Sequence, residues 1–285
     1  MSDHYWNRRR RRRTRTTRNG GPRDLRGLSI YDPIEFGIDE NGEPVEVTLA
    51  YRNLLIGGEP GSGKSSLLNT IIAHAALACD ATLWLFDGKL VELGLWRSIA
   101  DIFVGNDMTD ALNRLRQLQA EMELRYRLLE AVQRRKIMPT DALDVIVCVI
   151  DELAYYTATT GTKEEQEMFR ALVRDLVARG RAAGIIVVAA TQRPSADIIP
   201  TSLRDLFGYR VAFRCTTDSS SDIILSVGWA SEGYSAKTID PQALGVGWLL
   251  AEGGIPRRFK AAYLTDGLIR AVIAAALHLR RGPAA

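Results

Sequence analysis

Residues 58–65 read GEPGSGKS and constrain this chain more than any other stretch, because they fit the pattern G-x-x-x-x-G-K-[ST]. The apolar run NLLIG at 53–57 precedes the pattern and an apolar helical run follows it. Glycines in such a turn let successive N–H groups point inward as an anion nest, and the following helix adds its positive end. The sequence therefore predicts a strand, a phosphate-cradling loop and a helix. A chance glycine-rich turn would not bring all these parts into register.

Two residues of this loop carry predicted roles in chemistry. We expect Lys64 to reach the β- and γ-phosphates of a nucleotide and the Ser65 hydroxyl to be a ligand of Mg²⁺. The other expected nucleotide-binding residues lie in the same loop or the first helical turn: Gly58, Glu59, Pro60, Gly61, Ser62, Gly63 and Ser66.

A second apolar run, VIVCVIDE at 145–152, ends in two acids. We expect Asp151 to hold Mg²⁺ through its water shell and Glu152 to polarise the attacking water. Both acids could instead only cap the next helix, but the phosphate loop upstream disfavours that interpretation. The acid pair argues against a small GTPase or a kinase and predicts an ATPase that uses ATP and Mg²⁺.

The run at 185–190 is followed by TQRPS. A polar residue at the tip of the neighbouring strand can sense the γ-phosphate or orient the water, and Gln192 is the candidate. Its alternative role is that of a turn residue before Pro194.

Short apolar runs alternate with longer amphipathic runs, which predicts an α/β fold with a mostly parallel sheet and helices on both faces. The expected strands are 53–57, 82–87, 101–104, 145–151, 185–191 and 209–214. The expected helices are 64–79, 90–98, 108–135, 163–182 and 202–206. A C-terminal β-hairpin at 247–250 and 258–264 and a helix at 266–279 complete the prediction. Charges on most turns of 108–135 leave a solvated surface helix and an oligomer interface equally open.

Three segments are expected: a disordered arginine-rich arm at 1–28, a lead-in hairpin or strands at 29–50, and the main domain at 51–285. Residues 1–26 hold ten arginines against two aspartates, a formal charge of +8, which leaves −5 on the rest of a chain whose net charge is +3. Such an arm attracts nucleic-acid phosphates or an anionic membrane surface, or is simply a solvated tail. We favour nucleic acid.

Composition favours a cytoplasmic protein. The three cysteines, Cys79, Cys148 and Cys215, form no CxxC pair, which argues against a disulfide scaffold or a zinc ribbon. No run of 18 apolar residues predicts a transmembrane helix, and the arginine-rich start lacks the apolar core of a secretory signal. Peripheral attachment to the membrane is the second option.

Several motifs together resemble the motor domain of the FtsK/SpoIIIE DNA translocases, from about residue 51 to 266. Besides the phosphate loop they are FDGKLVEL (86–93), EMELRY (121–126), VIDELA (149–154), RGRAAGI (179–185) and ATQRPS (190–195). Within that family, the chain is most similar to the actinobacterial plasmid-transfer (conjugation) proteins. The similarity lies in the glutamate and proline inside the phosphate loop and in the short length of the chain.

The resemblance implies a RecA-like P-loop ATPase core that assembles into a homo-oligomer, a hexameric ring around double-stranded DNA. In such rings an arginine from the neighbouring subunit completes the ATP site. Arg125 matches the arginine of the E-M-E-x-R-Y motif and is the preferred finger, with Arg179 and Arg181 as alternatives. Membrane-associated partners of DNA transfer are also implied.

The sequence is compatible with three functions. The leading one is ATP-driven translocation of double-stranded DNA, in conjugal transfer of a plasmid or an integrative element. The second is a related ATPase that powers protein secretion of the type VII kind, whose members carry several ATPase modules and a membrane anchor. The third is an assembly factor that binds nucleotide without hydrolysing it, against which Glu152 and Gln192 both argue.

Overall fold

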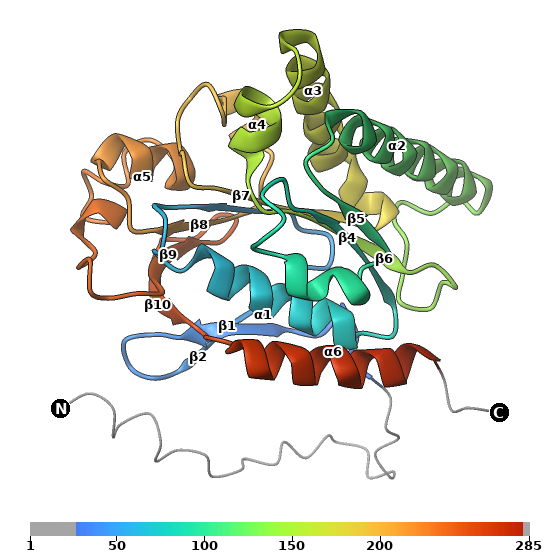
Figure 1. Cartoon of the computed structure of the whole chain (residues 1–285), viewed down its shortest axis with the longest axis horizontal. Helices are drawn as coiled ribbons and strands as arrows, with labels where there is room; N and C mark the ends of the chain where they lie inside the picture. The colour runs from blue at the N-terminus through green and yellow to red at the C-terminus, as the bar shows by residue number, and fades with distance from the viewer. Residues whose placement is uncertain (1–26, 282–285) are drawn as a thin grey trace.

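In this computed structural model the described residues are 27–281, so the predicted arm lies almost entirely outside them (Figure 1). The strands are β1 (Ile34–Ile38), β2 (Pro44–Val47), β3 (Leu54–Gly57), β4 (Ala81–Phe86), β5 (Ile102–Val104), β6 (Val145–Ile150), β7 (Ile185–Thr191), β8 (Tyr209–Phe213), β9 (Val246–Leu250) and β10 (Arg257–Ala261). The α-helices are α1 (Lys64–Leu77), α2 (Met108–Ala131), α3 (Lys163–Arg179), α4 (Thr201–Arg204), α5 (Asp218–Leu225) and α6 (Asp266–Arg281). Short 3₁₀ turns lie at Gly94–Ser98, Gly180–Ala183 and Ala236–Thr238, and a π-helix lies at Tyr155–Thr159.

The strands of the described chain form a single sheet with the order β2-β1-β10-β9-β8-β3-β7-β6-β4-β5. The six strands from β8 to β5 in that order run parallel. The other four continue the sheet in antiparallel fashion. Parallel neighbours require crossover connections, which the helices supply. The prediction of an α/β fold with a mostly parallel sheet is confirmed.

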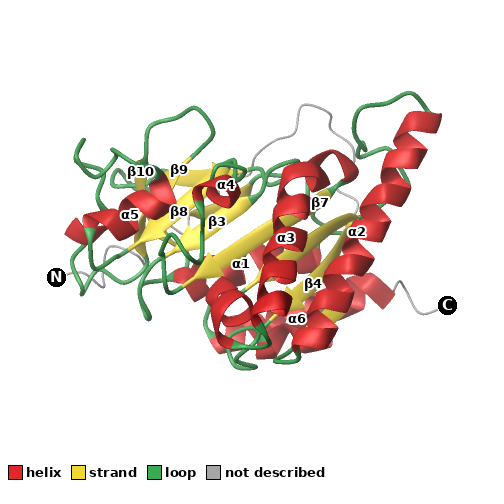
Figure 2. Cartoon of the chain, turned by 90° about the horizontal axis from the view of Figure 1, so that it is seen from above, coloured by secondary structure: helices red, strands yellow, loops and turns green. Residues whose placement is uncertain are grey.

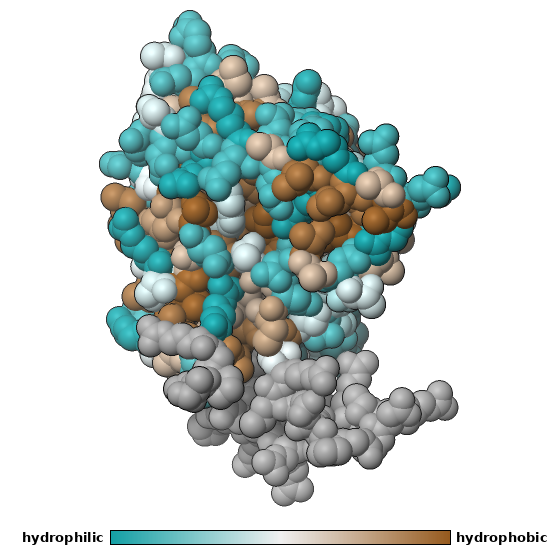
Figure 3. Space-filling view, turned by 90° about the vertical axis from the view of Figure 1, so that its right-hand side faces the viewer, coloured by the Kyte–Doolittle hydropathy of each residue, from teal (hydrophilic) through white to brown (hydrophobic). Residues whose placement is uncertain are grey.

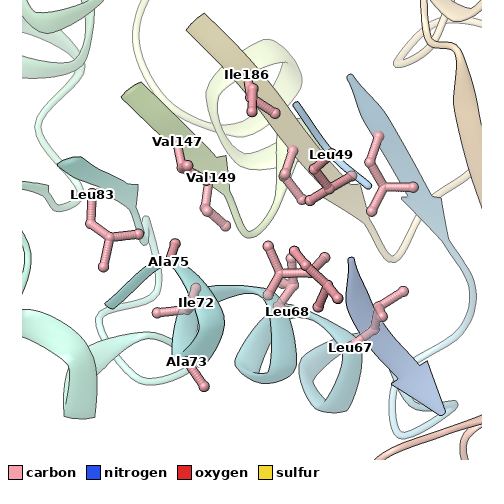
Figure 4. Packing of buried hydrophobic residues seen from close by; sticks show 14 of the residues in the cluster. Leu49, Leu67, Leu68, Ile72, Ala73, Ala75, Leu83, Val147, Val149 and Ile186 are labelled. Atoms are coloured by element: carbon pink, nitrogen blue, oxygen red, sulfur yellow. The ribbon is translucent and has the colours of Figure 1, made fainter. Parts of the chain in front are cut away.

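Side chains of the central strands alternate between two apolar cores. On β3, Leu54 and Ile56 belong to the core on the α1 side, and Leu55 belongs to the core on the opposite face. Successive side chains of a strand point to opposite faces, so a strand covered on both sides is apolar at every position. Figure 4 shows the first core, which includes Leu49, Leu67, Leu68, Ile72, Val147, Val149 and Ile186.

Helices cover both faces of the sheet (Figures 1 and 2). On one face α1 packs against α6, β1 and β4, and on the other face α2 packs against α3. None of the helices between residues 27 and 281 is long and apolar enough to cross a membrane.

The predicted helix at 90–98 is wrong in its first half, because residues 87–93 form an irregular loop. The fully buried Asp87 carboxylate accepts hydrogen bonds from the main-chain N–H groups of Lys89 (3.2 Å) and Leu93 (2.8 Å). A short acidic side chain that bonds nearby backbone in this way competes with helix formation. Leu90 has a φ of 62°, which lies outside the right-handed helical region.

Other boundaries differ by a few residues. Helix α2 ends at Ala131, and α3 ends at Arg179, after which a 3₁₀ turn leads to Gly184. Gly184 has a φ of 69° and turns the chain into β7. Helix α5 has no counterpart in the prediction, because its first turn is rich in serine, a weak helix former; the Thr217 side chain caps this turn by accepting a hydrogen bond from the main-chain N–H of Ser220.

Residues 29–50 form the β1–β2 hairpin and the connection into β3. Strand β1 pairs with β10, with Gly37 opposite Ala261. The hairpin therefore extends the same sheet that contains the phosphate loop.

Candidate active site

The loop 58–65 leaves the C-terminal end of β3 and enters α1 at Lys64, as the sequence predicts. Gly61 has a φ of 72° and Gly63 a φ of 124°, both in the region that favours glycine. A Cβ atom on Gly63 would lie 2.6 Å from the Cα atom of Gly245. The main chain of the loop therefore approaches the segment before β9 so closely that no larger residue fits at position 63.

Lys64 is buried at the base of this loop. Its ammonium donates hydrogen bonds to the carbonyl oxygens of Gly58 and Glu59, both at 2.7 Å. Burial disfavours the charged form and lowers the pKa of Lys64 to about 8, while the nearby Glu152 and Asp151 raise it. The lysine and the two acids that follow β6 therefore lie within electrostatic reach of one another.

Glu59 ties the outer part of the loop to the segment that follows β8. Its carboxylate forms an ion pair with Arg214 and accepts a hydrogen bond from the Thr216 hydroxyl. Its main-chain N–H also donates to the carbonyl of Arg214 at 2.9 Å. The unusual acid of the loop is therefore neutralised, so its charge opposes a bound phosphate less than a free carboxylate would.

Asp151 follows the last residue of β6 and is 6% exposed. Its Oδ2 atom is buried and has no hydrogen-bond partner among the described residues. Burial, followed by the charges of Glu92, Asp87 and Glu152, raises the pKa of Asp151 to about 7. A buried carboxylate oxygen without a donor is unfavourable in a protein interior and suits the binding of a cation.

Glu152 is held by the neighbouring strand β7. Its Oε1 atom accepts a hydrogen bond from the Thr191 hydroxyl at 2.7 Å, and its Oε2 atom accepts one from the main-chain N–H of Gln192 at 2.9 Å. The Lys89 ammonium lies 3.9 Å from Oε2. The predicted base is thus fixed in orientation, and Gln192 reaches it through its backbone.

Ser65 makes a contact that the sequence did not predict. Its hydroxyl donates a hydrogen bond to Oε2 of Glu92 at 2.8 Å. Glu92, Lys89 and Thr191 are the site residues that sequence reasoning missed. All three lie within the family motifs at 86–93 and 190–195, but their contacts depend on the turn built around Asp87 and on the pairing of β6 with β7.

The residues present fit Mg²⁺ and a nucleoside triphosphate. Mg²⁺ prefers oxygen ligands and is usually bound through one or two carboxylates together with substrate phosphates. The Ser65 hydroxyl uses its proton on Glu92 and keeps its lone pairs, and Asp151 offers an unpartnered oxygen. The glycine loop and Lys64 supply the donors for phosphate.

Comparison with known proteins relates this chain to one family of proteins. Residues 29–144 match the model of the FtsK/SpoIIIE family. The DNA translocase FtsK of Treponema pallidum (strain Nichols) is 34% identical over 262 residues, which cover 85% of this chain and 31% of that protein. The chain carries an FtsK/SpoIIIE domain. It spans about a third of the length of the curated relative that it matches here.

Solved structures share the fold of this FtsK/SpoIIIE domain. The pCW3 conjugation coupling protein TcpA, a monomer with ATPγS, matches with a TM-score of 0.71 at 22% identity, over 86% of this chain and 70% of that one. The cytoplasmic domain of the Thermomonospora curvata type VII secretion ATPase EccC matches with a TM-score of 0.69 at 21% identity, over 88% and 31%. The predicted RecA-like P-loop ATPase fold is confirmed.

Within the FtsK/SpoIIIE domain, Arg125 is enclosed by residues of its own chain. It is 5% exposed, and its Nε atom pairs with Glu121 at 2.7 Å. Its Nη1 atom donates to the carbonyls of Asp144 (2.9 Å) and Ala183 (3.0 Å). This guanidinium connects α2 to the starts of β6 and β7 in its own chain, which disfavours the finger role expected from the sequence.

The two alternative arginines line a basic cleft of about 580 Å³ together with Arg52, Arg135 and Lys136. Arg179 is engaged there by Asp175 and by Glu123, each at 2.6 Å. No described residue forms a side-chain hydrogen bond or ion pair with Arg181. This cleft lies at the N-terminal end of β7, and the phosphate loop follows the C-terminal end of its parallel neighbour β3. The cleft and the loop are therefore at opposite ends of these strands, roughly 20 Å apart.

Proposed function

We propose that this chain is an ATP-driven motor that translocates double-stranded DNA. The observation that carries the proposal is the pairing of a complete phosphate loop with the oriented Glu152 carboxylate in a domain of the FtsK/SpoIIIE family. The FtsK protein of Treponema pallidum is named a DNA translocase, and DNA is therefore the proposed substrate here.

Each site residue has a defined task in this proposal. Lys64 and the loop N–H groups bind the phosphates, and Ser65 and Asp151 hold Mg²⁺, which when bound neutralises phosphate charge. Glu152 accepts a proton from the attacking water, and its two hydrogen bonds from β7 keep its carboxylate aimed. Gln192 lies beside that carboxylate and is the proposed residue that senses the γ-phosphate.

Assembly into a ring is the second part of the proposal, with a hexamer as the expected homo-oligomer. Arg181 replaces Arg125 as the proposed arginine finger, because Arg181 lies in an open cleft without a side-chain partner among residues 27–281. The cleft and the phosphate loop lie at opposite ends of the parallel strands β3 and β7. A head-to-tail ring would therefore bring the cleft of one subunit to the nucleotide of the next.

Helix α2 offers an apolar surface for such contacts. Leu124 and Leu128 at the end of α2 and Val132, the residue that caps the helix, are spaced by four residues and are 45%, 46% and 56% exposed. Figure 3 views the side that is on the right in Figure 1, where this part of α2 lies, and shows apolar side chains gathered among polar ones. Apolar patches of this kind are typical of interaction sites, which favours an interface over a purely solvated helix.

The setting that we propose is conjugal transfer of a plasmid or integrative element, with a cytoplasmic location and membrane-associated transfer partners. The structural similarity to a conjugation coupling protein supports this setting. The similarity to a type VII secretion ATPase keeps protein secretion as the second candidate.

A rate measurement separates these two candidates. ATP hydrolysis by the full chain should rise when linear duplex DNA is added, and Lys64→Ala should show no hydrolysis with or without DNA, because the loop loses its main phosphate cation. A rate that linear duplex DNA leaves unchanged would favour the secretion ATPase.

A further inference from the structure

Ser65, a proposed Mg²⁺ ligand, is hydrogen-bonded to Glu92, a residue without a task in the proposed hydrolysis. Ser65 begins α1, and Glu92 lies 27 residues later, in the loop between β4 and the 3₁₀ turn at Gly94–Ser98. The Ser65 hydroxyl is the donor, since a carboxylate only accepts. The bond therefore fixes where the single hydroxyl proton points.

A hydroxyl whose proton is committed in this way presents only lone pairs to its other neighbours. A cation ligand must do the same, because a proton directed at Mg²⁺ would repel the metal. A carboxylate acceptor also draws the proton toward itself and makes the serine oxygen a stronger donor of electron density, as outer partners of metal ligands commonly do.

The loop that carries Glu92 is built to hold it in place. The buried Asp87 carboxylate binds the main-chain N–H of Leu93, the residue after Glu92, at 2.8 Å. Gly88 packs so closely on Tyr155 that a Cβ atom there would lie 2.1 Å from the ring. Leu93 itself is 1% exposed, so the backbone on the C-terminal side of Glu92 is anchored in the core.

We propose that Glu92 is a positioning residue for Mg²⁺, which orients the Ser65 hydroxyl so that its lone pairs face the metal. The inference rests on the proposed nucleotide site and adds an outer partner to it. In this role Glu92 touches neither the phosphates nor the metal and acts by fixing the Ser65 hydroxyl.

The test compares the affinity for ATPγS in excess Mg²⁺ and in EDTA. Wild-type protein should bind ATPγS more tightly with Mg²⁺ than in EDTA. In Glu92→Ala this ratio of affinities should be about 10-fold smaller, which is the lower end of the effect of outer-shell partners. Affinity in EDTA should stay unchanged, because Glu92 does not contact the phosphates. Ser65→Ala should lose the same gain, and the double variant should be no worse than Ser65→Ala, since both act through one interaction.

Two further variants control the experiment. Val91→Ala changes an exposed neighbour in the same loop and should behave as wild type. Glu92→Gln keeps an acceptor for the Ser65 proton and should retain most of the Mg²⁺ gain.

The outcomes separate the alternatives. If Glu92→Ala weakened ATPγS binding equally with Mg²⁺ and with EDTA, Glu92 would only support the structure of the loop. Tighter binding in EDTA would show that the carboxylate only repels phosphate. An intact Mg²⁺ gain in Glu92→Ala would overturn the role of Glu92 alone, whereas wild-type protein without any Mg²⁺ gain would overturn the proposed site as well.

Discussion

The Thr191 hydroxyl donates a hydrogen bond to Glu152 Oε1 at 2.7 Å, and so joins the proposed catalytic base, two residues after the end of β6, to the tip of β7. Thr191 is fully buried and Glu152 is 5% exposed. The adjacent main-chain N–H of Gln192 binds the other carboxylate oxygen. Any movement of the β7 tip would therefore redirect the Glu152 carboxylate.

Glu152→Gln should bind ATP as wild type does and hydrolyse it about 10²–10⁴-fold more slowly, because the water loses its proton acceptor. The amide fits the site, since the Thr191 hydroxyl can accept a hydrogen bond as well as donate one. Thr191→Val should show an intermediate loss with unchanged affinity. Nucleotide binding and single-turnover hydrolysis measure both effects. Hydrolysis by Glu152→Gln at the wild-type rate would show that another group is the base.

Stability should depend on pH through Asp151. Its folded-state pKa of about 7 lies above its ordinary value of 3.8, so its contribution to stability is full below about pH 4 and is lost as the pH rises to 7. Asp151→Asn should remove this decline and raise the free energy of unfolding at pH 8 by roughly 1–4 kcal/mol without nucleotide. Urea unfolding at pH 4 and pH 8 measures the difference. Parallel curves for both proteins would contradict the raised pKa.

Arg125→Ala should destabilise the fold by roughly 2–4 kcal/mol, because it leaves two carbonyls, one of them buried, without their donor and removes the partner of the half-buried Glu121. Arg127→Ala, at an exposed position of the same helix, is the matched control and should change stability little. Thermal melting tests both variants. A stable Arg125→Ala with a purely catalytic defect would restore the finger assignment.

Arg181→Ala should fold and bind ATP normally but hydrolyse it about 10³-fold more slowly in the assembled state, since a finger acts on the neighbour's phosphates. Mixing this variant with Glu152→Gln subunits should recover some activity, because one interface in the mixed ring then has both an intact base and an intact arginine. Co-assembled mixtures that stay inactive would exclude Arg181.

Deleting residues 1–26 should weaken DNA binding similarly for unrelated sequences and flatten its salt dependence. Each phosphate contact contributes about −0.9 to the slope of log K against log[salt] on duplex DNA. ATP hydrolysis without DNA should hardly change, because the arm precedes the ATPase core. An unchanged slope, combined with lost binding to anionic vesicles, would assign the arm to the membrane.

The parallel strands were predictable because burial on both faces leaves a continuous apolar run, and β7 was predicted residue for residue at 185–191. The phosphate loop was predictable because its glycines, lysine and helix are local in sequence. Contacts such as Ser65–Glu92 were not, because they depend on a turn whose shape is set by the buried Asp87 and by Leu90 at positive φ.

The burial of Arg125 could have been predicted from the sequence. Leu118, Met122, Arg125 and Leu129 are spaced by three or four residues, which places them on one face of α2. The other three residues are apolar, so the arginine lies on the buried stripe and must find partners within the chain. The family motif alone could not show this, because a motif gives no direction for a side chain.

Displacement of a third strand from linear duplex DNA tests the motor account most directly. A triplex-forming oligonucleotide is annealed along the duplex, and its release is followed after ATP is added. If the chain is a motor, the wild-type protein should release the third strand when ATP is added, and Glu152→Gln should release none at equal DNA occupancy. Wild-type protein that hydrolyses ATP on the duplex and leaves the third strand bound would contradict translocation.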